Sequence, residues 1–420
     1  MLRAVTSLTK ITIALSAIVW LGTGCLGSGR WFPDPHPPAP GVLLMQKLAP
    51  DSALNFGPTR IPEIPARRKA RMCCAFGTDM TVKVGEWVLP FLKVGQIKDL
   101  TGLGPHRYDG ATAAIDDSRQ GAFPGGEANG LMYTCNGGFI DTAHVRETVD
   151  WAAYFVSVLD RHLETGTTVE LSPEGADRRI VIPPVPEELI AEYGRDELII
   201  ALAQWLSYQG SVWHEIAQWY GWSLVTLYPE TLSGFSPEDP ISNAIGVNLL
   251  SGVDVEQLLS SEKTYNAHVD QLIQRGLEDL NPVSADLAAD VVQAVDGVWW
   301  DSQASLPDNE IVLRRYLDID TELEAWLVPE HVGSPEVRAR LDEQCGKNPE
   351  PAKIHIRDSA GGVPFDELAT FEIMPTGKTV EQPVFRQMAL PISQRDFPHL
   401  VEEITAKTRA ELGPRADRPD

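Results

Sequence analysis

Five polar residues within one apolar segment have the clearest capacity for chemistry in this chain. Ser207, Ser211, His214, Glu215 and Gln218 recur at spacings of three or four residues, which places them on one face of a helix. Buried polar groups are costly unless they are satisfied, so this face must meet partners, water or a ligand. The zinc-metalloprotease helix motif requires a second histidine four residues after the first, where this chain has Gln218. The structural alternative is a satisfied polar seam between helices.

His144 is the second candidate. It falls in the first turn of a predicted helix over residues 141–164, where the helix dipole disfavours an imidazolium. A neutral imidazole suits a metal ligand or a general base, and Asp141 lies three residues earlier, where it can orient the ring. A local hydrogen bond at the helix start is the alternative. Arg146 and Asp150 are spaced to pair on the helix surface.

These candidates predict a mixed nitrogen and oxygen site for a divalent metal. His144, His214 and Glu215 would be its ligands, with either Glu238 or Asp239 added, and such ligands suit zinc, iron or manganese. Glu215 and His144 would also be the catalytic pair. The predicted binding residues are His106 (in a Gly-rich and Pro-rich loop over 100–130), Asp141, Gln218 and Glu238. Glu238 and Asp239 are equally explained as acids at a helix start.

The cysteines allow two kinds of chemistry. Cys135 precedes Asn-Gly-Gly and would be a nucleophile if its thiol were free and a histidine lay beside it. An oxidising compartment favours a disulfide instead, and the candidates are Cys73, Cys74 and Cys135. The connectivity stays open, because sequence alone does not determine it. The chain has no P-loop, no Gly-x-Ser-x-Gly, no dinucleotide fingerprint and no Cys-x-x-Cys.

The sequence patterns around these residues predict a helix-rich α+β fold. A central buried helix is expected over 186–220, because its last two thirds are almost entirely apolar, aromatic or small. Other helices and small antiparallel β-hairpins should surround it. Ser236 is predicted to cap a helix that has Pro237 at its first position. The remaining expectations are helices over 253–276 and 284–298, hairpins within 73–94 and 168–182, strands near 353–356 and 369–373, and a strand or helix over 311–327.

The N-terminus predicts export and a lipid anchor. Arg3 and Lys10 are followed by an apolar run and by small residues that end at Cys25, an arrangement typical of a bacterial lipoprotein signal. An ordinary secretory signal is the alternative. The apolar run is too short to span a membrane. Leu26 after the lipidated cysteine favours the outer membrane, with the protein facing the periplasm.

The predicted organisation has five parts. Residues 1–24 are the signal peptide, 25–66 the lipidated cysteine (carrying acyl chains such as palmitate) and a spacer with nine prolines, 67–345 the main globular domain, 346–407 a C-terminal extension packed on it, and 408–420 a disordered tail. The formal net charge of −24 repels nucleic acid and excludes a nucleic-acid partner.

Several strings together resemble a known family. They are Cys73-Cys74-Ala75-Phe76-Gly77, Gly104-Pro105-His106-Arg107-Tyr108, the stretch from Tyr133 to Arg146, the stretch from Trp213 to Trp222, and Phe235-Ser236-Pro237-Glu238-Asp239. They resemble the bacterial lipoprotein family DUF4056, a domain of unknown function, over residues 70–345. The resemblance implies an envelope lipoprotein with no established activity, and it carries over no catalytic residue.

Two functions remain open at this point. The first is hydrolysis of an envelope substrate in a cleft lined by His144, His214 and Glu215, with a divalent metal such as zinc as cofactor. The second is a non-catalytic lipoprotein that binds an envelope partner or supports the envelope. The sequence does not decide whether the protein is an enzyme, and it does not identify the substrate, the partner, the metal or the oligomeric state.

Overall fold

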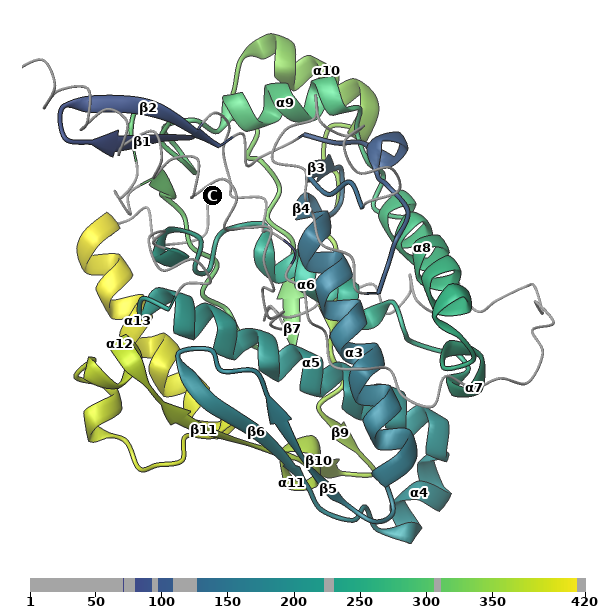
Figure 1. Cartoon of the computed structure of the whole chain (residues 1–420). Helices are drawn as coiled ribbons and strands as arrows, with labels where there is room; N and C mark the ends of the chain where they lie inside the picture. Colours follow the sequence, from purple (N-terminus) through teal and green to yellow (C-terminus); the bar gives the residue numbers. More distant parts are fainter. Residues whose placement is uncertain are drawn as a thin grey trace, which may run out of the picture.

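A computed structural model describes Arg71 and residues 80–92, 97–108, 127–222, 230–305 and 311–413. Within these residues the chain forms eleven α-helices and five small antiparallel sheets, so the predicted helix-rich α+β class is confirmed. Four of the sheets are two-stranded, and the fifth has three strands in the order β11-β6-β5. Figure 1 shows helices around much of the molecule, with the hairpin of residues 80–92 at one edge. The signal and spacer predicted for residues 1–66 lie outside the described residues.

Three helices form the centre of the molecule: α3 (Thr142–His162), α5 (Arg195–Trp219) and α6 (Asp239–Asn248). Helix α3 packs along both α5 and α6 (Figure 1). From Leu198 to Gln218 every residue of α5 except Gln209 is buried, which confirms the predicted central helix. A helix that is apolar nearly all round must be enclosed on every side, and this one is.

The predicted helix over 186–220 is in fact two helices. A short α4 (Glu187–Tyr193) precedes α5, and Gly194 between them has φ +84°. Only glycine adopts this conformation without steric cost, so the chain can change direction there. Residues 253–276 likewise divide into α7 (Val255–Leu258) and α8 (Glu262–Glu278), while α9 (Ala285–Ala294) is the helix expected over 284–298.

The start of α6 differs from the prediction. Ser236 is not its cap and Pro237 is not its first residue, because the helix begins at Asp239 with Glu238 as N-cap and Pro240 in the first turn. Phe235 has φ +61°, so the chain turns sharply before the helix instead of entering it at Ser236. The predicted helix start was therefore wrong by two residues. This shift brings Asp239 to the helix terminus.

One hairpin leads directly into a central helix. The short hairpin of β3 (Leu131–Thr134) and β4 (Gly138–Asp141) runs directly into α3, and Asp141 caps that helix, since its Oδ1 accepts from the Ala143 N–H at 2.7 Å. The predicted hairpins at 73–94 and 168–182 are β1 (Met80–Val84) with β2 (Trp87–Leu92), and β5 (Thr167–Leu171) with β6 (Ala176–Ile182).

Residues after 345 pair with strands and pack on helices from the earlier part of the chain. Strand β11 (Thr370–Pro375) pairs with β6, and β8 (Lys353–His355) pairs with β7 (Glu322–Glu324), the only strand element within 311–327 among the described residues. Helix α13 (Phe397–Leu412) packs on α5 and continues beyond residue 408, where the sequence suggests that a tail begins. Residues 414–420 are outside the described part of the chain.

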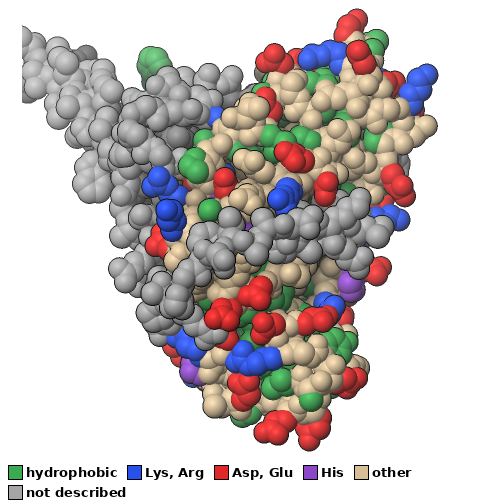
Figure 2. Space-filling view, turned by 90° about the vertical axis from the view of Figure 1, so that its right-hand side faces the viewer, with side chains coloured by type: hydrophobic (Ala, Val, Ile, Leu, Met, Phe, Trp, Pro, Cys, Tyr) green, Lys and Arg blue, Asp and Glu red, His purple; other side chains and the backbone are tan. Residues whose placement is uncertain are grey.

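The smaller elements complete the described part. They are η1 (Leu100–Gly102), η3 (Glu230–Leu232), α10 (Pro335–Cys345), β9 (Ser359–Ala360), β10 (Val363–Pro364), α11 (Phe365–Leu368), α12 (Gly377–Glu381), η5 (Phe385–Gln387) and η6 (Gln394–Asp396). Over the described residues no helix has the length and apolarity needed to cross a membrane. Figure 2 shows acidic side chains spread over the visible face, in keeping with the net charge of −24.

The disulfide corrects one expectation. Cys135 is bonded, but to Cys345 at the end of α10, with the two Cα atoms 5.2 Å apart, and not to Cys73 or Cys74. The latter two cysteines lie outside the described residues. The chain brings the turn of the β3–β4 hairpin beside α10, a contact across 210 residues that no local pattern predicts. The bond leaves no thiol at Cys135 for nucleophilic catalysis.

Candidate metal centre

Three side chains able to bind a metal meet where the β3–β4 hairpin enters α3 and where the turn at 235–238 enters α6. Asp141, His144 and Asp239 each offer one ligand atom, and these atoms all lie within 4.8 Å of one another. The His144 Nε2 atom is 3.3 Å from Asp141 Oδ2 and 3.2 Å from Asp239 Oδ1. All three residues are buried. Two helix N-termini, from segments almost 100 residues apart, thus supply one compact Asp/His/Asp triad.

The remaining polar atom of each triad member is held by the protein. Asp141 Oδ1 accepts from the Ala143 N–H, and the Ser236 hydroxyl donates to Asp239 Oδ2 at 2.9 Å. His144 Nδ1 lies 3.3 Å from Asn243 Oδ1. Because an amide oxygen only accepts, this contact places the proton on Nδ1 and leaves the Nε2 lone pair facing the two carboxylates. One ligand atom of each side chain therefore lies within 4.8 Å of a ligand atom of the other two.

The close approach of α3 and α6 fixes this geometry. A Cβ atom at Gly246 would come within 1.9 Å of Thr148 Oγ1 and 2.3 Å of the Val145 carbonyl oxygen, so only glycine fits there. The Thr148 hydroxyl lies 2.9 Å from the His144 carbonyl oxygen and 3.0 Å from that of Asn243, which ties the two helices together. The Ser242 hydroxyl accepts from the Asp141 N–H at 2.8 Å. Backbone contacts thus hold the hairpin, α3 and α6 in register around the triad.

Glu238 is buried beside the triad but is not one of the three. Neither of its carboxyl oxygens has a well-aligned hydrogen bond from a described residue. Burial raises the pKa of Glu238 to about 8, and the negative charge of Asp141 adds to the rise, while the nearby Ser236 hydroxyl and the charge of His144 oppose it. An acid of this kind, in contact with the triad's charges, is the fourth polar group of the site.

Arg315 balances the acids of this region. Its Nη1 atom donates to the carbonyl oxygens of Leu232 and, at 2.7 Å, Gly234, and it therefore fastens the turn before α6. Burial lowers the pKa of Arg315 to about 10, while the negative charges of Glu215, Glu238 and Asp239 act in the opposite direction. The guanidinium remains charged at neutral pH and offsets part of the buried negative charge.

The predicted ligands on α5 lie elsewhere. His214 Nδ1 pairs with the Glu174 carboxylate, which also forms an ion pair with Arg178 at 2.6 Å, and the His214 ring packs edge-on against Trp222. Glu215 accepts a hydrogen bond from the Phe235 N–H in the turn before α6. Among the described residues, the group of ligand atoms that could hold a metal contains neither His214 nor Glu215. Consecutive residues on a helix point about 100° apart, so the side chains of His214 and Glu215 contact different parts of the protein.

The rest of the polar face on α5 is bonded inside the protein. The Ser207 hydroxyl donates to the Thr148 carbonyl oxygen at 3.0 Å, and the Ser211 hydroxyl donates to that of Tyr208 at 2.8 Å. Gln218 is buried on the same helix. This part of the stripe is the satisfied polar seam that the sequence left open as an alternative.

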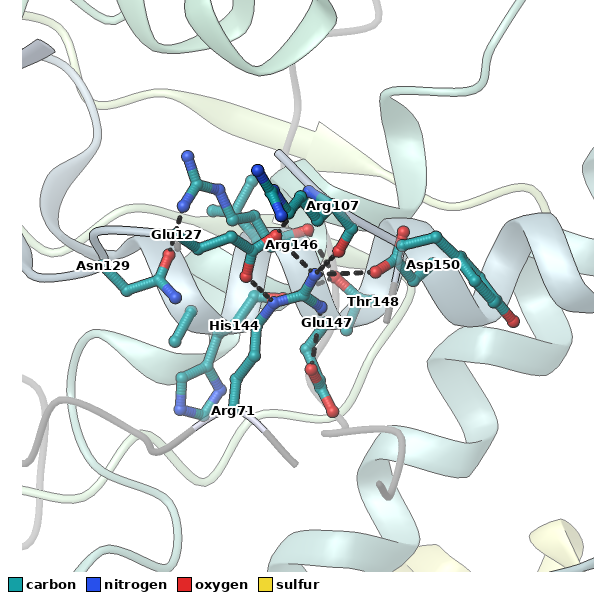
Figure 3. Close-up of polar contacts among 12 residues, drawn as sticks. Arg71, Arg107, Glu127, Asn129, His144, Arg146, Glu147, Thr148 and Asp150 are labelled. Carbon is teal, nitrogen blue, oxygen red and sulfur yellow. Dashed lines mark hydrogen bonds and ion pairs between the residues drawn. The ribbon is translucent and has the colours of Figure 1, made fainter. Parts of the chain in front are cut away.

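His106 belongs to a second buried cluster. Its Nε2 atom lies 3.0 Å from Asp150 Oδ1 on α3, and its backbone N–H donates to Asp270 on α8 at 3.0 Å. Asp150 and Arg146 do not pair on the surface as expected, since both are buried. Arg146 instead donates to Asn129 Oδ1 at 2.7 Å. Figure 3 shows Asp150 and Arg146 within a network centred on Arg71.

Sequence reasoning selected His144 and its neighbour Asp141 but did not assign Asp141 as a ligand. It treated Asp239 as one of two acids at a helix start, and it missed Asn243, Arg315 and Arg71. The available signal was that two predicted helices both begin with an acid next to other polar residues, at Asp141 and Asp239. Which two helix starts meet is a property of the packing of α3 on α6, and sequence does not show that.

Comparison with known proteins identifies a family but no characterised relative. The family model described as "Protein of unknown function (DUF4056)" matches residues 61–329, which include the whole triad. No curated protein and no solved structure matches the chain. The family match covers more than half of the chain and agrees with the resemblance in the sequence motifs, so this chain belongs to the DUF4056 family.

Proposed function

We propose that Asp141, His144 and Asp239 bind one divalent metal ion. The observation that carries this proposal is the convergence of three buried ligand atoms whose outer partners already hold them in place. One nitrogen and two carboxylate oxygens suit zinc, iron or manganese. Three protein ligands also leave a coordination position for water or a substrate, as catalytic zinc sites do.

The reaction we propose for this site is hydrolysis. A bound divalent ion lowers the pKa of a coordinated water and makes it a nucleophile near neutral pH. Glu238 lies beside the ligands and outside the ligand set, and because its raised pKa keeps it largely protonated near neutral pH, it would donate a proton to the leaving group. Asn243 keeps the His144 ring in the tautomer that binds, and Arg315 offsets the buried acids.

The proposed substrate belongs to the cell envelope. The basis is the lipoprotein-type N-terminus ending at Cys25, which would attach the protein to the membrane, with the outer membrane and the periplasmic side favoured by Leu26. The disulfide between Cys135 and Cys345 is compatible with an extracytoplasmic location. The partners in this proposal are the membrane, through the lipid anchor, and an envelope molecule.

A non-catalytic envelope protein is the second candidate. Two observations favour it: all three triad residues are buried, and the Ser207 and Ser211 hydroxyls of the polar face on α5 are bonded within the protein. In this case a protonated His144 would bridge the two carboxylates as a structural ion pair, without a metal. The two candidates therefore differ in whether the triad takes up metal.

Metal content decides between them. We expect near-stoichiometric metal in the full chain purified without added metal or affinity tag, and its loss in His144→Ala and in Asp239→Asn. Asn243→Ala keeps all three ligands but removes the partner of His144 Nδ1, so it should weaken metal binding about 10–100-fold. Elemental analysis and titration with zinc, manganese and iron measure these effects.

Two control variants make the result specific. His214→Ala removes a buried histidine outside the triad, and His355→Ala removes a half-exposed one, so both should retain the metal. If the parent takes up none of the three ions, the triad is a structural ion pair and the hydrolase proposal fails. Loss of metal in His214→Ala but not in His144→Ala would place the site on α5 instead.

A further inference from the structure

Arg71 is surrounded by carboxylates to an unusual degree. Its side chain is 1% exposed, and its Nε and Nη2 atoms form a bidentate pair with Glu127 at 2.6 and 2.8 Å. Nη1 contacts Glu147 at 2.9 Å, and Nη2 contacts Asp150 at 2.8 Å. Nη2 also donates to the Arg107 carbonyl oxygen at 2.9 Å. Every nitrogen of the guanidinium is therefore bonded, and Figure 3 shows the acids on several sides of it.

The walls of this site come from separate parts of the chain. Glu127 precedes β3, Glu147 and Asp150 lie on successive turns of α3, and the Arg107 carbonyl belongs to the loop before residue 109. The Arg107 N–H donates back to Glu127 at 2.8 Å, and the Tyr108 N–H donates to Asn266 on α8 at 2.7 Å. The loop is thus fastened to the same acids and to α8.

Further groups hold the acids in place without filling the site. The Tyr265 hydroxyl donates to Asp150 at 2.5 Å, and His106 lies between Asp150 (3.0 Å) and Glu127 (3.4 Å). The His106 Nδ1 atom is buried beside Glu127 and has no well-aligned hydrogen bond to a described residue. The acids are therefore pre-positioned by the protein, as in a binding site, and do not gather around Arg71 from solvent.

Arg71 supplies positive charge to three acids at once. Three buried carboxylates face its guanidinium, while the hydrogen bonds of Arg146 to described residues go to Asn129 and to the Gly104 carbonyl oxygen. A buried ion pair that loses one partner leaves an uncompensated charge, which is strongly destabilising. A planar guanidinium also fits a bidentate carboxylate in a way that an ammonium cannot.

We propose that Glu127, Glu147 and Asp150 form a guanidinium-binding site whose resident ligand is Arg71, which fastens the chain that leads into the domain. We call these four residues the arginine clasp. Arg71 follows the spacer predicted over 25–66, so the clasp is the point where the proposed lipid tether is joined to the folded body. This inference does not depend on metal binding at the triad.

Chemical rescue of the full chain tests the clasp. Arg71→Ala should lower the melting temperature, and millimolar methylguanidinium, far below denaturing concentrations, should raise it again by at least about 2 °C in a saturable manner. Wild type should show no such rise, because its site is filled. Arg395→Ala removes an exposed arginine that pairs with Asp366, and it should not respond.

Methylammonium provides the matched ligand control. It carries the same charge without the planar fork, so it should not rescue Arg71→Ala. Equal rescue by both cations, or no rescue by either, overturns the proposal, because the acids would then need only any positive charge or would not form a site.

A second variant covers the case in which Arg71→Ala does not fold. Trypsin must take the arginine side chain into its own pocket, so the Arg71–Met72 bond of the native chain should resist cleavage while the clasp is closed. Glu127→Gln removes the bidentate partner and should increase cleavage at this bond about tenfold or more, which corresponds to the loss of roughly 1.4 kcal/mol of protection. Equal cleavage rates in wild type and Glu127→Gln would refute the clasp.

Discussion

At the scale of the residue, this protein buries many charged side chains in three clusters. Each cluster offsets the free-energy cost of burying charge in a different way. In the Asp/His/Asp triad, one ligand atom of each residue lies near those of the other two, and the second oxygen of each carboxylate accepts a hydrogen bond. The arginine clasp pairs its acids with a complete guanidinium. Glu174 pairs with both Arg178 and His214. Buried charges are tolerated only when they are paired and hydrogen-bonded, and each of these clusters supplies such partners.

Glu127 predicts how stability depends on pH. Burial alone would raise its pKa, but the charge and hydrogen bonds of Arg71 prevail, with help from Arg146 and His106, and hold the pKa well below the usual range. A carboxylate with a depressed pKa contributes stability above its unfolded pKa of about 4.3 and loses it as pH falls toward the folded value. The protein should therefore lose stability progressively below about pH 5.

The comparison variant is Glu127→Gln. It should be less stable than wild type by about 3 kcal/mol at pH 7, and its free energy of unfolding should fall less steeply from pH 5 to pH 3, because the titrating group is gone. Urea unfolding at a series of pH values measures both effects. Parallel curves for the two proteins would mean that Glu127 does not contribute to the acid dependence.

At the scale of the element, much of the architecture could be predicted because local patterns determine it. The alternating strands of β5 and β6, the apolar length of α5 and the helix α3 were all predicted correctly from the sequence. The boundaries that failed depend on backbone conformation instead. Gly194 divides the long helix, and Phe235 with φ +61° delays α6 to Asp239. Whether a chain turns at such a residue is set by tertiary contacts, which a local pattern does not contain.

The contact of α3 with α6 gives a prediction at this scale. Gly246→Ala should destabilise the protein by about 1–3 kcal/mol and weaken metal binding at the triad, because the added methyl group collides with the Thr148 hydroxyl and the Val145 carbonyl and forces the helices apart. Chemical denaturation and metal titration measure the two effects together.

A second glycine supplies the control. Gly276 lies on α8, where a Cβ atom would meet methyl groups of Leu249 at 3.0 Å and of Ile245 at 4.0 Å. Gly276→Ala should change stability little, because the flexible side chain can move and alanine favours the helix by up to about 1 kcal/mol. If Gly246→Ala is equally mild and retains full metal affinity, the close approach of the helices is not what positions the triad.

At the scale of the whole molecule, the features that sequence did not reveal are those that join distant segments. The triad unites the starts of α3 and α6, the arginine clasp unites Arg71 with α3 and the loop before residue 109, and β11 completes a sheet begun by β5 and β6. Each joins segments that are far apart in the chain, and composition or periodicity says nothing about such pairings. The sequence identified most of the elements, His144 with its neighbour Asp141, and Asp239 as one of two candidate acids, while the packing showed that these three residues meet.

The disulfide gives the prediction for the whole chain. Cys135 and Cys345 close a loop of 210 residues that contains α3, α5 and α6, so the bond restricts the unfolded chain strongly. Replacing both cysteines with serine should lower the free energy of unfolding by about 2–5 kcal/mol. Because Cys135 lies in the turn between β3 and β4, one strand away from Asp141, the loss should also loosen the hairpin that delivers Asp141 to the triad.

Two measurements separate these effects. Urea unfolding of the double variant and of reduced wild type should agree, since both lack only the bond. Metal affinity should fall less than stability does, because the Asp141 cap and its bond to Ser242 remain. If the double variant is as stable as oxidised wild type, the pairing of Cys135 with Cys345 does not stabilise the fold. If its metal affinity falls as far as that of His144→Ala, the hairpin depends on the disulfide for its position, and packing against α6 alone does not hold it.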